Sequence, residues 1–106
     1  KAKLEQTRLE QENASEKMVL ELIQASNNLD DARLETEISD RSLEQAEENM
    51  KVSGKQYDGG LVNLSDYLAA QMVWQQAYQT RVDAHFQLYV NYIAYLKAAG
   101  QLHPTD

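Results

Sequence analysis

Residues 57–71 of the 106-residue chain read YDGGLVNLSDYLAAQ, and this stretch decides the fold. The adjacent Gly59 and Gly60 predict the end of a helix, because glycine adopts left-handed backbone angles without a steric penalty at Cβ. Asn63 is a favourable N-cap, and Asp66 follows three residues later, where its carboxylate can reach back to the cap as in a capping box. The stretch therefore predicts a short turn between two helices that run antiparallel and pack together.

Upstream of the turn, residues 2–53 contain no Gly or Pro and are rich in Glu, Leu, Ala, Gln and Lys, which favour helix. Apolar and small side chains recur there at alternating steps of three and four residues, which is a sustained heptad pattern. Its positions are Leu22, Ala25, Leu29, Ala32, Thr36, Ser39, Leu43, Ala46, Met50, Ser53 and Tyr57. Large residues alternate with small ones, so this helix is expected to pack closely against its neighbour.

Downstream of the turn, the pattern predicts a second helix that runs to about Ala99, with Gly100 ending it and Pro104 preventing its resumption. Its packing seam reads Tyr67, Ala70, Trp74, Ala77, Arg81, Ala84, Leu88, Asn91, Tyr95 and Ala98. A second stripe reads Leu64, Leu68, Gln71, Gln75, Tyr78, Val82, His85, Tyr89, Tyr92 and Leu96. A helix packed on one side needs only one stripe. The second stripe therefore predicts a neighbour that a two-helix hairpin does not itself supply.

Together these patterns predict an all-α chain that forms one long antiparallel helical hairpin, of coiled-coil type, over residues 1–106. We expect helix at about 2–58, a turn at 59–62, helix at about 63–99 and a tail at 100–106. The small residues expected in the packing seam are Ala25, Ala32, Ala46, Ala70, Ala77 and Ala84. Because the first helix is the longer one, roughly twenty N-terminal residues are expected to have no partner within the chain.

Composition limits the functional classes. The 17 acidic residues outnumber the 10 basic ones, for a net charge of -7, whereas a nucleic-acid binder needs clustered Lys and Arg. There is no cysteine, and no stretch approaches the ~20 apolar residues that span a bilayer. No signal peptide is recognisable, so an exported parent would make this chain an excised segment. We find no nucleophile–base pair, phosphate-binding glycine loop or metal-ligand spacing, and expect neither an enzyme nor a bound metal or cofactor.

Two polar residues stand out as candidates. Asp66 fits either a helix cap or an acidic ring at the mouth of an assembly, and the two roles are compatible. His85 lies on the second stripe and is far in sequence from His103, so we expect a structural or exposed histidine. The aromatic residues are spread along the second helix and are interpreted as packing residues.

Residues 57–71 resemble the signature of TolC-type outer membrane efflux channels. In that family a Tyr is followed three residues later by a Gly, and a hydroxyl-bearing or small residue, an Asp and a Leu then lead into an Ala-Gln pair. The corresponding residues here are Tyr57, Gly60, Ser65, Asp66, Leu68, Ala70 and Gln71. The flanking residues Leu43, Ala46, Glu47, Asn49, Met50, Ala77, Tyr89, Leu96, Ala99 and Gly100 also fit, so the resemblance covers nearly the whole chain.

This resemblance implies a homotrimeric tunnel through the periplasm of a Gram-negative bacterium, joined to an outer-membrane β-barrel. Each protomer of the family holds two repeats, each with a helical hairpin at its periplasmic tip. The run from Leu96 to Gly100 resembles the C-terminal repeat. The implied function is export of small molecules or proteins, with a periplasmic adaptor (membrane fusion) protein docked at the tip and an inner-membrane transporter engaged indirectly. No part of this segment is implied to insert into the membrane.

The resemblance also implies roles for residues at the turn. Gly60 matches the tip glycine where the adaptor docks, together with its neighbours Gly59, Leu61 and Val62. Tyr57 and Asp66 match residues that help to close or line the periplasmic aperture. The chain departs from some members at two positions. Val62 stands where they carry an Arg that ties protomers together by ion pairs, and Ala69 stands where they carry a further acid.

Two other functional classes are compatible with a long hairpin: a purely structural coiled coil, and the hairpin of a periplasmic adaptor. Two stripes on the second helix favour a tunnel wall over a two-stranded rod. The transported substrate, the adaptor and pump, and the choice between drug efflux, metal efflux and protein secretion do not follow from these residues.

Overall fold

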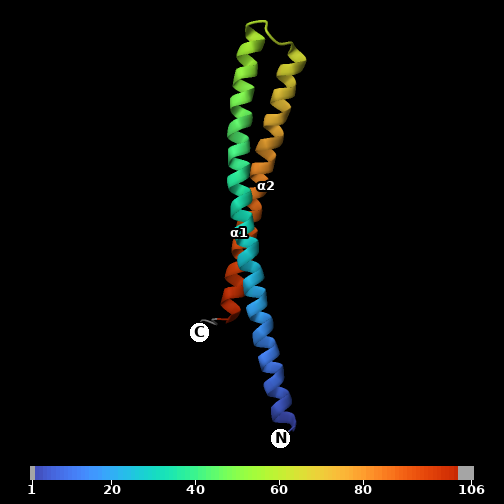
Figure 1. Cartoon of the computed structure of the whole chain (residues 1–106), viewed down its shortest axis with the longest axis vertical. Helices are drawn as coiled ribbons and strands as arrows, with labels where there is room; N and C mark the ends of the chain where they lie inside the picture. Colours follow the sequence, from blue (N-terminus) through green and yellow to red (C-terminus); the bar gives the residue numbers. More distant parts are fainter. Residues whose placement is uncertain (1, 103–106) are drawn as a thin grey trace. The chain divides into compact units, whose positions relative to one another are not determined.

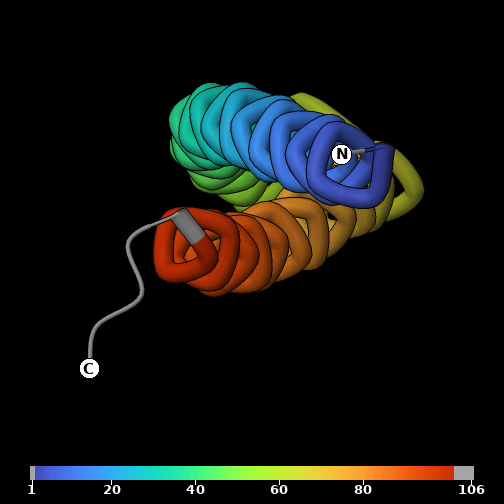
Figure 2. Tube along the Cα trace, turned by 90° about the horizontal axis from the view of Figure 1, so that it is seen from below, coloured from blue at the N-terminus to red at the C-terminus, as the bar shows by residue number. Residues whose placement is uncertain are grey.

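The computed structural model describes residues 2–102 of the chain. Over these residues it contains two α-helices, α1 (Ala2–Asp58) and α2 (Leu64–Leu102), and no strand. Both helices are continuous coils (Figure 1 and Figure 2). The all-helical fold class and the two-helix hairpin expected from the sequence are therefore observed.

The chain divides into two compact units, one formed by residues 32–88 and the other by residues 2–31 and 89–102. In the first unit, the C-terminal part of α1 and the N-terminal part of α2 lie side by side and antiparallel, joined by the turn (Figure 1, green to orange). This unit is the helical hairpin, and it contains every contact between the two helices that is described below.

The core consists of residues on the heptad positions of α1. Its buried side chains are Leu29, Ala32, Thr36, Ser39, Leu43 and Ala46. The two buried hydroxyls are satisfied within their own helix, since Thr36 donates to the carbonyl of Arg33 (2.7 Å) and Ser39 to that of Thr36 (2.9 Å). A small polar residue can therefore lie in the seam without an unpaired buried group.

The end of α2 differs from the sequence prediction. The helix does not stop at Ala99 but continues through Gly100 to Leu102, so a tail beginning at 100 was wrong. Glycine costs about 1 kcal/mol in a helix but does not force its end, and Gly100 is not among the residues with positive φ. The described part of α2 extends to Leu102. Residues 103–106 lie outside the described part of the chain.

The first part of α1 is almost entirely solvent-exposed. Between residues 2 and 21, only Met18 is even half-buried. This agrees with the expectation that these residues have no partner within the chain. Neither helix, over the described residues, contains a stretch long and apolar enough to cross a membrane.

Candidate functional site

The turn ends α1 with a Schellman motif centred on Gly60. The Gly60 N–H donates to the carbonyl of Tyr57 (3.0 Å), and the Leu61 N–H donates to that of Gln56 (2.8 Å). Gly60 has a φ of 74°, the left-handed conformation that this motif requires. The hydrogen bonds satisfy carbonyls that the helix end would otherwise leave unpaired, so the turn has a defined backbone geometry.

The start of α2 is capped by Asn63, whose side-chain oxygen Oδ1 accepts a hydrogen bond from the Asp66 N–H at 2.8 Å. This is the N-cap interaction expected from the sequence. The reciprocal half of a capping box is not formed: among the described residues, the exposed Asp66 carboxylate makes no hydrogen bond back to Asn63. The carboxylate in the first turn of α2 is thus available to solvent or to another molecule.

Tyr57 packs within the hairpin. Its ring stacks on that of Tyr67 across the two helices, with centroids 5.6 Å apart and an interplanar angle of 10°. The Tyr67 ring in turn lies against Gly54, where an added Cβ would be 3.3 Å from the Tyr67 Cε1 atom. Gly54 lies inside α1. Because Gly54 has no side chain, the stacked rings of Tyr57 and Tyr67 have room to pack between α1 and α2 next to the turn.

The apex of the turn exposes an apolar side chain beside two glycines. Leu61 is 78% exposed, whereas its neighbour Val62 is half-buried. In a Schellman motif the residue at the Leu61 position often packs on the last turn of the helix. Leu61 remains exposed instead, and apart from its own chain neighbours nothing lies within 4 Å of the position that a Cβ on Gly60 would occupy. The apex is therefore apolar and sterically open, on a backbone with the defined geometry of a Schellman motif.

The six small residues expected in the packing seam are all at least half-buried. Ala32 and Ala46 are buried, and Ala25, Ala70, Ala77 and Ala84 are half-buried. The remaining seam residues of α2, from Tyr67 to Ala98, are half-buried as well. The structure therefore places the turn residues together at one end of the hairpin formed by residues 32–88, and the small residues along the helices.

The second stripe of α2 has little cover within the chain. Within residues 32–88, Met72 and Phe86 lie beside this stripe, and both side chains are 62% exposed. The exposed apolar side chains of this helix up to residue 88 are Leu64, Leu68, Met72, Val73, Tyr78, Val82 and Phe86. In residues 89–102 the exposed apolar side chains include Tyr89, Tyr92, Ile93 and Leu96. Large exposed apolar surfaces usually mark contacts with another molecule.

A charged cluster joins the two helices in the middle of the hairpin. One carboxylate oxygen of Asp40, Oδ1, lies 2.7 Å from Arg81 Nε and 2.9 Å from His85 Nε2. Hydrogen bonds from His85 and then from Arg81 hold the pKa of Asp40 below its ordinary value of 3.8. Sequence reasoning missed this cluster, because its members are 41 and 45 residues apart and only the register of the hairpin brings them together.

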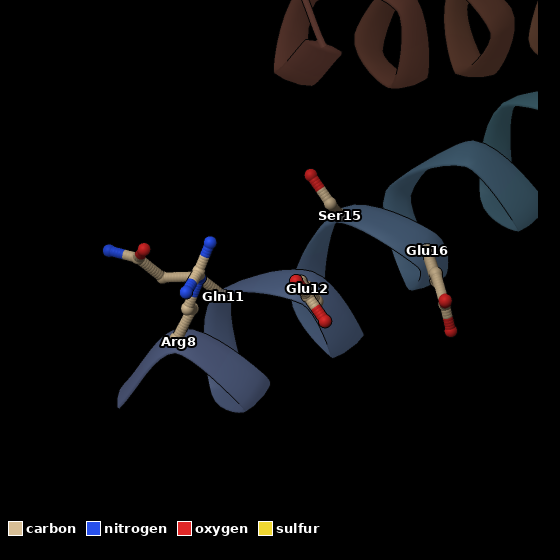
Figure 3. Close-up of a pocket in the computed structure, with 5 residues that line it drawn as sticks. All are labelled: Arg8, Gln11, Glu12, Ser15 and Glu16. Carbon is tan, nitrogen blue, oxygen red and sulfur yellow. The ribbon is translucent and has the colours of Figure 1, made fainter. Parts of the chain in front are cut away.

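Shallow hollows lie along the N-terminal part of α1. One of them is lined by Arg8, Gln11, Glu12, Ser15 and Glu16 (Figure 3). All five residues come from a single helix, and their side chains point in different directions rather than toward a common point (Figure 3). Among residues 2–102, no group of three or more His, Asp or Glu side chains is positioned to hold a metal ion.

Comparisons with known proteins add no relative. No family model matches the chain, no curated protein matches it, and no solved structure matches it. The resemblance to TolC-type channels therefore rests on the residues of the turn and its flanks.

Proposed function

We propose that this chain is a tunnel-wall segment of a TolC-type outer membrane efflux channel: the C-terminal periplasmic hairpin, part of an α-helical barrel made by three protomers. Its turn docks a periplasmic adaptor protein, and an inner-membrane transporter is engaged through that adaptor. The parent channel exports small molecules or proteins across the outer membrane of a Gram-negative bacterium. In this role the segment is neither an enzyme nor a nucleic-acid binder.

The observation that carries the proposal is the apex of the turn. The Schellman motif fixes the backbone, Leu61 projects into solvent, and the space beside Gly60 is empty. An exposed apolar side chain next to an open glycine suits a partner whose backbone approaches closely. A coiled coil that served only as a spacer would have no need for an apolar residue at this position.

The exposed second stripe of α2 supports the same role. A wall helix contacts a neighbour on each side, and the seam of α2 uses only one side. The exposed Asp66 carboxylate agrees with an acidic ring at the aperture, because it is not occupied by the helix cap. Tyr57 already stacks on Tyr67, so any aperture role of Tyr57 would use the edge of a ring that the hairpin holds in place.

The test compares Gly60→Ala with Gly60→Leu in the full-length parent channel. Both variants place a Cβ at a positive φ, so both are expected to lose about 1 kcal/mol of hairpin stability. Only the leucine adds bulk in the space where the partner would approach. We expect Gly60→Leu to abolish adaptor co-purification and efflux, while Gly60→Ala largely retains both.

Leu61→Asp provides a second arm, because its exposed side chain contributes little to folding. It is expected to weaken adaptor binding with an unchanged hairpin melting temperature. If Gly60→Leu and Leu61→Asp both leave adaptor binding and efflux intact, this turn is not the docking tip, and a purely structural coiled coil becomes the better interpretation.

A further inference from the structure

The charged cluster of Asp40, Arg81 and His85 is not used by the proposed docking function. It connects α1 to α2 through a single acceptor atom, Asp40 Oδ1, which both basic side chains contact. The two contacts differ chemically. The guanidinium of Arg81 is permanently charged, whereas an imidazole gains its charge only on protonation and ordinarily titrates near pH ~6.5.

His85 lies next to an edge of α1 that carries several acidic residues. On α1, Glu37 and Glu44 lie one turn before and after Asp40 on the same side of the helix, and Glu47 follows one further turn along. Glu47 faces α2, because its Oε1 accepts a hydrogen bond from Trp74 Nε1 at 3.4 Å. Arg33 extends this edge of α1 in the other direction.

On α2, the charged residues nearest to His85 are Arg81 and Asp83. Asp83 accepts a hydrogen bond from Gln79 of its own helix at 3.0 Å. Asp40 of this acidic edge contacts Arg81 and His85, and a proton on His85 adds a second positive charge beside it.

We propose that Asp40, Arg81 and His85 form a pH-sensitive clamp between α1 and α2, in which Arg81 is a constant attachment and protonation of His85 tightens the clamp. The bond to the ionised Asp40 carboxylate is charge-assisted on the acceptor side already, and protonation of His85 adds an ionised donor and a direct ionic attraction. Asp40 stays ionised across this pH range, because its pKa is held below 3.8. Acidification from neutral pH toward about pH 5 therefore stabilises the middle of the hairpin through this cluster.

The test is a pair of double-mutant cycles on the chain, measured by urea unfolding at fixed protein concentration at about pH 5 and about pH 8, on either side of the imidazole range. The first cycle combines Asp40→Asn with His85→Gln, and the second combines Asp40→Asn with Arg81→Gln. At the lower pH the Asp40–His85 coupling is expected to change the unfolding equilibrium constant by about two- to fivefold, as for other partly exposed ion pairs. At the higher pH this coupling is expected to be smaller, whereas the Asp40–Arg81 coupling stays the same.

Asp31→Asn, which removes an exposed acid elsewhere on α1, is the matched control, and its coupling to His85→Gln is expected to be close to zero at both pH values. Equal Asp40–His85 couplings at the two pH values would overturn the clamp. This result does not bear on adaptor docking at the turn.

Discussion

The sequence predicted that Asn63 and Asp66 form one capping box, but in the structure the two residues have different roles. Asn63 supplies the side-chain oxygen of the cap, and Asp66 contributes only its backbone N–H to that bond. Asn63→Ala is therefore expected to cost about 1 kcal/mol of unfolding free energy. Asp66→Ala keeps the cap and loses only a favourable charge at the helix N-terminus, which is about 0.3–1 kcal/mol and weakens with salt. Urea unfolding of the two variants at low and high salt measures this difference.

The same substitution tests the aperture role of Asp66 in the parent channel. Asp66→Ala removes one negative charge from each protomer and is expected to lower cation conductance, whereas Asn63→Ala is expected to leave conductance unchanged. If Asp66→Ala costs as much stability as Asn63→Ala and conductance is unaltered, the carboxylate acts in capping and the aperture role is withdrawn.

Gly54 and Tyr67 are coupled across the hairpin, and this coupling can be measured. Alanine favours an interior helical position over glycine by about 1 kcal/mol. At position 54 its Cβ would press on the Tyr67 ring at 3.3 Å and disturb the stack on Tyr57, which is worth about 0.5–1.5 kcal/mol. Gly54→Ala is therefore expected to be nearly neutral in the unsubstituted chain and to stabilise by about 1 kcal/mol when Tyr67 is already Leu. Equal effects of Gly54→Ala in the two backgrounds would mean that the ring moves aside without cost.

For the two helices, the Asp40 cluster predicts how the hairpin responds to acid. The folded-state pKa of Asp40 is lowered, first by His85 and then by Arg81, from its ordinary 3.8. A carboxylate whose pKa is lower in the folded chain than in the unfolded chain stabilises the fold at pH values above the unfolded-state pKa. This stabilisation is lost as the pH falls from 3.8 through the lower, folded-state pKa. The melting temperature of the unsubstituted chain should therefore exceed that of Asp40→Asn at pH values above about 5, and the difference should shrink below pH ~4. Asp31→Asn, with the same loss of charge, is expected to show no such convergence in acid.

The helices also show which features sequence patterns can predict. The heptad on α1 predicted residues such as Leu29, Ala32 and Ala46 in the core, because helical periodicity alone determines which residues share a face. Local chemistry similarly predicted the cap at Asn63. What the sequence could not provide was the register between α1 and α2, since a small-residue seam allows several registers of similar packing. The Asp40 cluster and the Gly54–Tyr67 contact both depend on that register.

At the scale of the whole molecule, the exposed apolar side chains of α2 predict self-association. Its exposed apolar residues include Met72 and Phe86, and transfer of one phenylalanine from water to an apolar contact is worth about 1.5–3 kcal/mol. Phe86→Glu is therefore expected to raise the dissociation constant in sedimentation equilibrium by about tenfold or more. Thr80→Glu places the same charge at an exposed polar position of the same helix, and a much smaller effect is expected. The helical circular dichroism of both variants should match that of the unsubstituted chain at concentrations where it is monomeric.

The net charge of the chain allows a second, independent test of self-association. Each copy carries a net charge of -7, so association brings like charges together. If apolar contacts on α2 drive association, added salt screens the repulsion and should strengthen it, since the Debye length falls from about 10 Å at 0.1 M to about 3 Å at 1 M. Association driven by ion pairs between the acidic part of α1 and the few basic residues would weaken with salt instead. A dissociation constant that rises with salt would show that ion pairs rather than apolar contacts on α2 drive the association. A stable monomer at high concentration with Phe86 still exposed would show that α2 requires no second copy as its neighbour.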